Sequence, residues 1–406
     1  MTSHPIATRV GVDTHGTSRG NGETAARARR SWYAAAALIG VHVVLAWFLR
    51  APAITTANDD AVYAMLARAV RALNYRELYT PGAPVHSQYP PGYPSFLALT
   101  EALLGEHLDA MLAAGILSSA AALAIFFVTV RQLWSERLAL GALALAAINP
   151  ALLSLAGLVR SESLFLVLSV LTLAAAARRP VSRGSLFLAA FAAIAAALTR
   201  SVGVTLVAAV WLVWMGERRY RAATIFAVAA ALTVGGWLTW TVRAPTQIVG
   251  RSYVADAALG SRGARHGVVG SVARRAAANI RSYGAEEVPQ VIPFPTVKGT
   301  TVDNWFWVVM TLVLGAMGAA GLWKRWRAAA VFVGCYGLLL ALWPYTSERF
   351  LAPQLPFFLL IFLCGASALA RRWRAAPAPL LPLALGLAIG ATSVARDAAS
   401  LGEVSG

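Results

Sequence analysis

Two adjacent carboxylates, Asp59 and Asp60, follow the first long apolar run of the chain in the stretch TTANDDAVYAMLARAV. In one interpretation they only stabilise a helix, because Asn58 is a good N-cap residue and acids in a first turn complement the helix dipole by a few tenths to about 1 kcal/mol. In the other they do chemistry, because a carboxylate within hydrogen-bond reach of a hydroxyl can take its proton. Tyr63, four residues after Asp59, is expected on the same helical face.

Single charged residues also stand at the ends of later apolar runs. Arg160, Arg200 and Arg349 are each alone in a short turn, and Glu162 begins an apolar run. The planar guanidinium group can bind a phosphate through two donors. An acidic residue at the start of a membrane span, such as Glu162, is by default a candidate functional residue. The alternatives are arginines that reach out to lipid headgroups and an ion pair between Glu162 and Arg160.

The composition indicates the class of protein that must position these residues. The chain of 406 residues is 58% hydrophobic and 13% charged, with a mean hydropathy of +0.62, whereas about a quarter of a soluble domain is charged. The net charge of +17 does not indicate a nucleic-acid partner, because the basic residues form short clusters between apolar runs, as membrane topology produces. We therefore expect an all-α polytopic membrane protein. The two cysteines lie inside apolar runs, without metal-ligand spacing.

Eleven apolar runs predict about 11 transmembrane helices, within a range of 10 to 12. Several runs are shorter than the roughly 20 residues that a straight span needs. The first run is interpreted as a span, with a signal peptide as the alternative, because Ala51-Pro-Ala53 resembles a cleavage site. The runs are 31–49, 108–130, 138–157, 162–177, 184–199, 202–216, 223–242, 304–323, 328–343, 350–370 and 379–395.

Clustered arginines predict the orientation. Two or three Arg or Lys residues occupy every second connection, whereas the short turns on the other side carry one each, which is the asymmetry of the positive-inside rule. We expect a plasma (inner) membrane protein with a cytoplasmic N-terminus. The expected segments are a disordered cytoplasmic tail (1–30), a single membrane domain (31–396) with outer loops at 50–107 and 243–303, and a short C-terminal tail (397–406).

The first outer loop is predicted to contain two amphipathic helices at the membrane surface. Val62, Met65, Leu66, Ala69 and Leu73 recur at helical spacing after the acid pair. Prolines at 90, 91 and 94 end any preceding helix, so a second short helix is expected over 95–104. Three polar or aromatic residues precede the prolines: His86, Gln88 and Tyr89.

Four segments carry a resemblance to a known family. DDAVYAMLARAV, PPGYPSFLAL, RSESLFLVLSVL and RFLAPQLPFFLLIF resemble GT-C glycosyltransferases, in particular the protein O-mannosyltransferase and lipid A aminoarabinose transferase group and their bacterial relatives. The likeness spans roughly 31–370. The resemblance implies an inverting enzyme that passes a sugar from a polyprenyl-phosphate carrier to an acceptor hydroxyl of a lipid, glycan or protein at the outer face of the membrane.

The resemblance also implies roles for individual residues. Asp59 would be the general base, with Asp60 and Glu162 assisting it. These three acids could hold a divalent cation, although no spacing demands one. The donor phosphate would lie against arginines, of which Arg349 leads because its surroundings match the family, followed by Arg200 and Arg160. Tyr63, His86, Gln88 and Tyr89 are expected to bind substrate.

One feature departs from the family. Some relatives carry a lysine just before the paired prolines, whereas this chain has Gln88 and Tyr89 there. Either another arginine neutralises the phosphate or the donor is bound differently.

A transporter or flippase of a lipid-linked or small polar substrate is the alternative function, and a non-catalytic scaffold is a third. Transporters place ionisable residues near the midplane, often with repeat symmetry. Here the candidate charges gather at one face and no repeat is visible, which favours the enzyme. Tryptophans near span ends are assigned to an interfacial belt: Trp305, Trp307 and Trp343.

Overall fold

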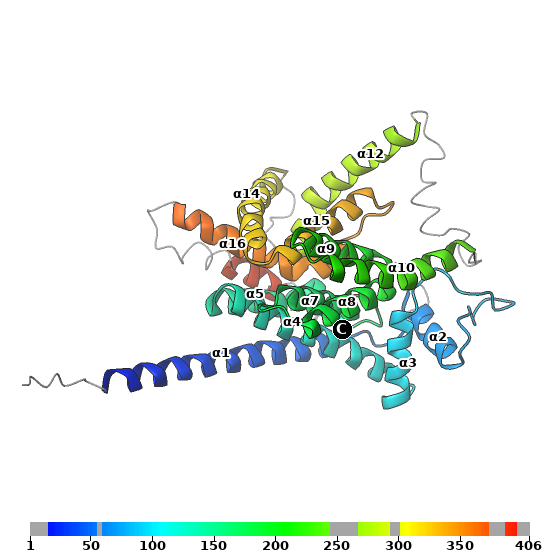
Figure 1. Cartoon of the computed structure of the whole chain (residues 1–406), viewed down its shortest axis with the longest axis horizontal. Helices are drawn as coiled ribbons and strands as arrows, with labels where there is room; N and C mark the ends of the chain where they lie inside the picture. The colour runs from blue at the N-terminus through cyan, green and yellow to red at the C-terminus, as the bar shows by residue number, and fades with distance from the viewer. Residues whose placement is uncertain (1–14, 55–58, 244–266, 293–300, 373–385, 396–406) are drawn as a thin grey trace, which may run out of the picture.

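The structure is a computed structural model, and it is described for residues 15–54, 59–243, 267–292, 301–372 and 386–395. Within these ranges all regular structure is helical, with one isolated bridge between Arg76 and Val85 (Figure 1). The all-α prediction is therefore confirmed.

Every apolar run overlaps a helix, but the helices differ in length. Five of those described are long and apolar enough to cross a membrane: the apolar part of α1 (His15–Phe48), α4 (Leu108–Leu133), α10 (Tyr220–Arg243), the later part of α14 (Thr301–Arg325), and the segment Glu348–Arg372 with α16 (Leu355–Arg372). A sixth span is formed if α5 (Glu136–Ala147) and α6 (Pro150–Ala156), bent by 60° to each other, are counted together. The chain is thus a multi-pass membrane protein, and the number of 11 spans stays a prediction.

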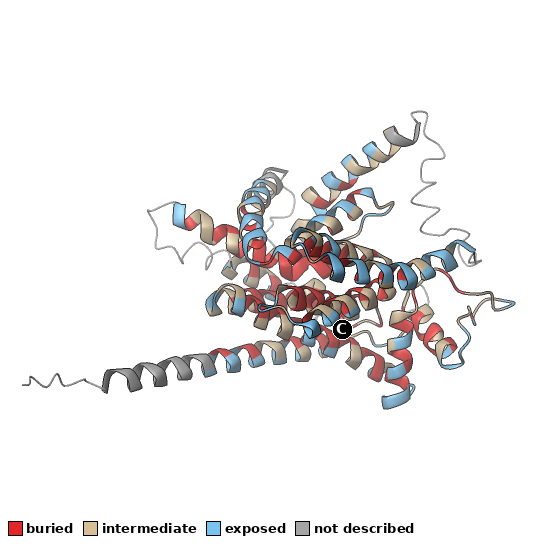
Figure 2. Ribbon diagram, in the orientation of Figure 1, coloured by how far each residue is buried: buried red, intermediate tan, exposed pale blue. Residues whose placement is uncertain are grey.

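Shorter apolar helices complete the bundle. They are α7 (Glu162–Ala177), α8 (Arg183–Thr199), α9 (Val204–Gly216), α15 (Arg327–Leu342) and a last helix, Gly386–Ala395. α7 packs against both α4 and α8, and α14 packs along α16. Buried side chains are concentrated in α4, α7 and α16, whereas α1, α10 and α14 keep largely exposed apolar faces that lipid can cover (Figure 2).

The first helix begins earlier than the sequence predicts. α1 starts at His15, so residues 15–30 extend the helix that precedes and enters the span, instead of forming a disordered tail. Ala25, Ala26 and Ala28 are strong helix formers, and no proline or glycine separates them from the apolar run. The remainder of that predicted tail, like the predicted C-terminal tail 397–406, lies outside the described residues.

The polar segment 50–107 folds into two helices at one end of the bundle. α2 (Asp59–Arg71) packs against α3 (Gly92–Leu104), which in turn packs against α4 (Figure 1). Their shared apolar cluster includes Tyr63, Ala67, Tyr93, Leu97 and Met111. The two predicted helices are confirmed. We refer to this end as the α2/α3 end.

Two details of these helices differ from the prediction. α3 starts at Gly92 instead of residue 95, because Pro94 lies in its first turn, where a missing N–H breaks no helical hydrogen bond. α2 stops at Arg71, and Leu73 has a left-handed φ of 51° and is 96% exposed. The buried face of α2 consequently runs through Tyr63 and Leu66 and does not reach Leu73.

Close backbone contacts position the α2/α3 end against α8. A Cβ atom on Gly92 would lie 2.6 Å from the carbonyl oxygen of Leu198, and a Cβ atom on Gly203 would lie 2.6 Å from the backbone of Ala196. Only glycine permits such approaches. Both contacts fix the chain around the end of α8, where Arg200 follows.

The second polar segment, 243–303, is described in part. α12 (Gly267–Ser282) leads into a π-helical turn (Tyr283–Glu287) and α13 (Val288–Val291). The Asn279 side chain donates hydrogen bonds to the carbonyls of Leu340, Ala341 and Trp343, the last at 2.7 Å. These bonds cap the end of α15 and hold the chain that carries Trp343.

Candidate active site

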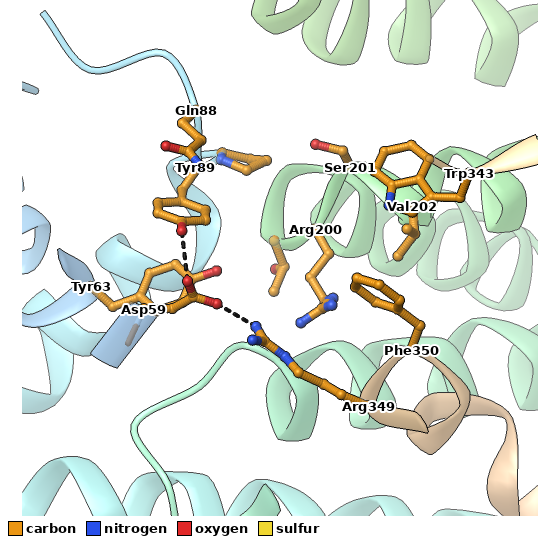
Figure 3. A pocket seen from close by; sticks show the side chains of 12 residues that line it. Asp59, Tyr63, Gln88, Tyr89, Arg200, Ser201, Val202, Trp343, Arg349 and Phe350 are labelled. Carbon is orange, nitrogen blue, oxygen red and sulfur yellow. Dashed lines mark hydrogen bonds and ion pairs between the residues drawn. The ribbon is translucent and has the colours of Figure 1, made fainter. Parts of the chain in front are cut away.

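A cavity of about 170 Å³ lies at the α2/α3 end, between α2, the segment before α3 and the ends of several membrane helices. Polar and aromatic side chains from distant parts of the sequence converge there (Figure 3). The lining residues are Asp59, Tyr63, Gln88, Tyr89, Pro90, Thr199, Arg200, Ser201, Val202, Trp343, Arg349 and Phe350.

Two acids and two arginines form a connected ion cluster at this cavity. Glu162 accepts through one oxygen, Oε1, from Arg200 at 2.8 Å and from the Nε of Arg349. The Nη2 group of Arg349 also donates to Oδ2 of Asp59. The formal charges of the four groups sum to zero. Glu162 is 2% exposed, so the pairing with two cations compensates for its loss of hydration.

Each member of the cluster stands at an element boundary. Glu162 is in the first turn of α7, where the helix dipole favours an acid. Arg200 is the extended residue between α8 and a short 3-10 turn, Ser201–Gly203. Arg349 lies in the 3-10 helix Glu348–Gln354, and its own backbone N–H donates to the capping side chain of Ser347. The site therefore sits where membrane helices end.

Asp59 faces the cavity with both oxygens engaged. Oδ1 accepts the hydroxyl of Tyr89 at 2.7 Å, and Oδ2 accepts from Arg349 (Figure 3). Its side chain remains 25% exposed, so a small molecule in the cavity can reach it. An ionised carboxylate has further lone pairs on each oxygen, and it can accept a proton from a hydroxyl placed beside it.

Tyr63 continues the network behind Asp59. Its hydroxyl lies 3.2 Å from Oγ of Ser161, and this Oγ also accepts from Arg200 at 3.0 Å. Burial raises the pKa of Tyr63 well above its usual value, so the hydroxyl stays protonated. The expectation that Asp59 and Tyr63 share one face of α2 is confirmed, since both line the cavity.

Six of the ten residues singled out in the sequence line the cavity, and a seventh, Glu162, joins them through the ion cluster. Asp60 is buried at 2% exposure and does not line the cavity, and Arg160 is also absent from its wall. Glu162 pairs with Arg200 and Arg349, so the alternative of an ion pair with Arg160 is wrong.

His86 lies behind the cavity wall. The side chain is fully buried, its Nδ1 lies 3.1 Å from Glu77, and its Nε2 accepts the backbone N–H of Tyr89 at 2.8 Å. Both ring nitrogens are thus engaged inside the protein. The structure does not bring the ring to the cavity wall, so His86 is not placed to bind substrate there as the sequence analysis expected.

Sequence reasoning missed several neighbours of the site. Trp343, assigned to the interfacial belt, lines the cavity beside Phe350, and Ser161 links Tyr63 to Arg200. The position of Trp343 directly before Pro344 and six residues before Arg349 is a signal that could have indicated it. Ser161 stands between two residues that the sequence had already singled out.

Within the described part of the chain, no group of three or more His, Cys, Asp or Glu side chains is placed to hold a metal ion. Asp59 and Glu162 face arginines instead of each other, and Asp60 lies away from the cavity wall.

Removing the charge of Glu162 is expected to destabilise the protein strongly. In Glu162→Gln, the guanidinium group of Arg200, 9% exposed, loses its countercharge, and breaking a buried pair costs about 3–5 kcal/mol. Glu136→Gln is the control, because Glu136 pairs at 3.5 Å with Arg131, which is more exposed than Arg200. The thermal unfolding midpoint of purified Glu162→Gln should be clearly lower than that of Glu136→Gln. Equal midpoints for the two variants would contradict this account of the cluster.

Comparison with solved structures shows which known folds this arrangement of helices resembles. Among solved structures, the chain resembles ArnT from Cupriavidus metallidurans bound to undecaprenyl phosphate, with 15% identity and a TM-score of 0.56 over 89% of this chain and 69% of that one. Apo ArnT gives 14% identity and a TM-score of 0.56 over 92% and 75% of the two chains.

A second similar structure is the oligosaccharyltransferase AglB from Archaeoglobus fulgidus, in complex with an inhibitory peptide and a dolichol-phosphate. It shares 14% identity and a TM-score of 0.53, and the match covers 91% of this chain but only 56% of AglB. No protein-family model and no curated protein matches the sequence. At these identities the likeness establishes the fold, and the resemblance to GT-C proteins expected from the sequence is confirmed at that level.

Proposed function

We propose that the protein is a membrane glycosyltransferase that moves a sugar from a polyprenyl-phosphate donor to an acceptor hydroxyl at the outer face of the membrane. The observation that carries the proposal is the meeting of Asp59, Arg200 and Arg349 at one cavity at the helix ends. The likeness to ArnT with bound undecaprenyl phosphate and to AglB with a dolichol-phosphate supports a lipid-linked donor.

Asp59 is the proposed general base. The acceptor oxygen attacks the anomeric carbon and its proton passes to the Asp59 carboxylate, while the bond from that carbon to the phosphate oxygen breaks and the electron pair leaves with the phosphate. Attack opposite the leaving group inverts the anomeric centre. Asp59 is suited to this role because it borders the cavity and its Oδ1 is held by the Tyr89 hydroxyl, a neutral donor.

Arg349 and Arg200 are the proposed partners of the departing phosphate. The phosphate gains negative charge as the bond breaks, and fixed cations beside it stabilise that charge more in the transition state than in the ground state. In the free protein Arg349 is neutralised by Asp59 and Glu162. A donor phosphate that enters the cavity would also bind Arg349 and weaken the ion pair between Arg349 and Asp59. Donor binding would thereby free the Asp59 carboxylate to act as the base.

The cluster lies at the ends of α7, α8 and the helix before α16, away from the middle of the bundle. This placement favours chemistry at a membrane surface over transport through the bilayer. Arginine clusters in the alternate connections support the proposal that the α2/α3 end faces outward.

The proposal is tested with membranes that contain the protein and a panel of labelled polyprenyl-phosphate sugars. One donor should transfer its label to a membrane acceptor and release polyprenyl phosphate, and transfer should depend on the protein. Labelling that is the same without the protein for every donor would contradict the proposal. The panel also identifies the sugar, which no residue of the sequence specifies.

A further inference from the structure

A chain of hydrogen bonds runs from a buried acid to Asp59. It begins at Glu77, passes through His86 and Tyr89, and ends at Oδ1 of Asp59. Glu77 is not among the residues that the sequence singled out. Glu77 and His86 have no exposed surface, whereas Tyr89 and Asp59 border the cavity.

The direction of each bond follows from chemistry. A backbone N–H can only donate, so Nε2 of His86, which receives the Tyr89 N–H at 2.8 Å, carries no proton. The proton of the neutral ring must then be on Nδ1, from which it is donated to Glu77 at 3.1 Å. Burial lowers the pKa of His86 to about 4, so this neutral form persists at physiological pH.

Further contacts hold the segment between His86 and Tyr89. The Tyr75 hydroxyl donates to the carbonyl of Tyr89 at 2.8 Å, and the indole N–H of Trp240, on α10, donates to the carbonyl of His86 at 3.0 Å. The His86 and Tyr89 rings stack with centroids 5.5 Å apart. Two side chains from outside, together with its own stacked rings, therefore fix a segment without regular structure.

The Tyr89 hydroxyl determines which oxygen of Asp59 is left to pair with Arg349. Arg349 holds only Oδ2 of Asp59, while Tyr89 occupies Oδ1. A guanidinium group binds a carboxylate best through two parallel bonds. If the Tyr89 hydroxyl were absent, Oδ1 would be free to turn toward Arg349, and the carboxylate would be engaged on both oxygens by a cation.

We propose that Glu77, His86 and Tyr89 form a positioning unit that keeps one oxygen of Asp59 directed at the acceptor and out of a two-bond pair with Arg349. The inference rests on the proposed function, in which Asp59 is the base. Tyr89 positions Asp59 directly, and His86 and Glu77 act through Tyr89.

Tyr89→Phe tests the unit by removing one hydroxyl and nothing else. With the donor that the panel identifies, kcat should fall about 10- to 100-fold, as for a displaced catalytic group, while the KM for the donor changes little.

Tyr79→Phe is the matched control. Tyr79 lies in the same segment, and its buried hydroxyl has no hydrogen-bond partner among the described residues, so kcat should match that of the unsubstituted protein. His86→Gln, which keeps an acceptor for the Tyr89 N–H, should retain more activity than His86→Ala. Equal thermal unfolding midpoints show that the variants are folded.

Two results would overturn the inference, and they differ from each other. If the unsubstituted protein transfers sugar and Tyr89→Phe has the same kcat, or loses activity only through the donor KM, the positioning unit is wrong and the proposed function stands. If the unsubstituted protein transfers no sugar from any donor, the proposed function fails and the inference fails with it.

Discussion

Asp59→Asn should lower kcat for sugar transfer by about 1,000-fold or more, because general base catalysis contributes up to about 10⁴-fold and an amide cannot take the proton. Asparagine has the shape of aspartate and can still accept the Tyr89 hydroxyl, so the fold is expected to survive. The loss of charge also releases Arg349 from one of its two acidic partners. The variant should therefore bind polyprenyl phosphate as tightly as the unsubstituted protein or more tightly.

This combination separates a base from a structural acid. Kinetics on purified protein give kcat, and equilibrium binding of undecaprenyl phosphate in lipid nanodiscs gives the affinity. Asp109→Asn is the matched control, because Asp109 is an exposed acid near the same end of the bundle that contacts Arg50 at 3.4 Å; both parameters should be unchanged. Full activity of Asp59→Asn would exclude Asp59 as the base.

Arg349→Ala should weaken donor binding about 100-fold and also reduce kcat. Removing Arg349 changes the formal charge of the four-residue cluster from zero to −1, because Asp59 and Glu162 then face only Arg200. Truncating one member of a partly buried charge pair costs roughly 2–5 kcal/mol, and 2.7 kcal/mol corresponds to a factor of about 100. The donor KM and the affinity for undecaprenyl phosphate should therefore both change.

For Arg349→Lys, the donor affinity and kcat should lie between those of the unsubstituted protein and those of Arg349→Ala. One ammonium group keeps the charge but cannot reproduce the planar contacts to Asp59 and Glu162. Arg243→Ala is the control, because Arg243 is an exposed arginine at the end of α10 and does not line the cavity. If Arg349→Ala bound undecaprenyl phosphate as well as Arg243→Ala, Arg349 would not be a phosphate ligand.

The helices could be predicted because their signals are local. The run 162–177 coincides with α7, because polar residues mark its start and arginines follow its end. The polar residues are Arg160, Ser161 and Glu162. The same argument placed Asp59 and Tyr63 on one face of α2, which depends only on helical spacing. The N-terminal extension of α1 was missed because polar helix-forming residues lack an apolar period.

The contacts within the site could not be predicted, because they join residues that are distant in sequence. Arg349 lies 187 positions from Glu162 and 290 from Asp59, and no local pattern shows which acid it meets. The burial of His86 likewise depends on Glu77, Tyr75 and Trp240, which surround it only after the segment folds onto α10. A lone histidine in a polar segment carries no such information.

A structure of the protein in lipid nanodiscs with bound undecaprenyl phosphate would test most directly whether this cavity holds a lipid phosphate next to a base. We predict phosphate oxygens within about 3 Å of the guanidinium groups of Arg349 and Arg200, with Asp59 released from Arg349 and facing the phosphate. A phosphate bound elsewhere, with Arg349 still joining Asp59 to Glu162, would contradict the account.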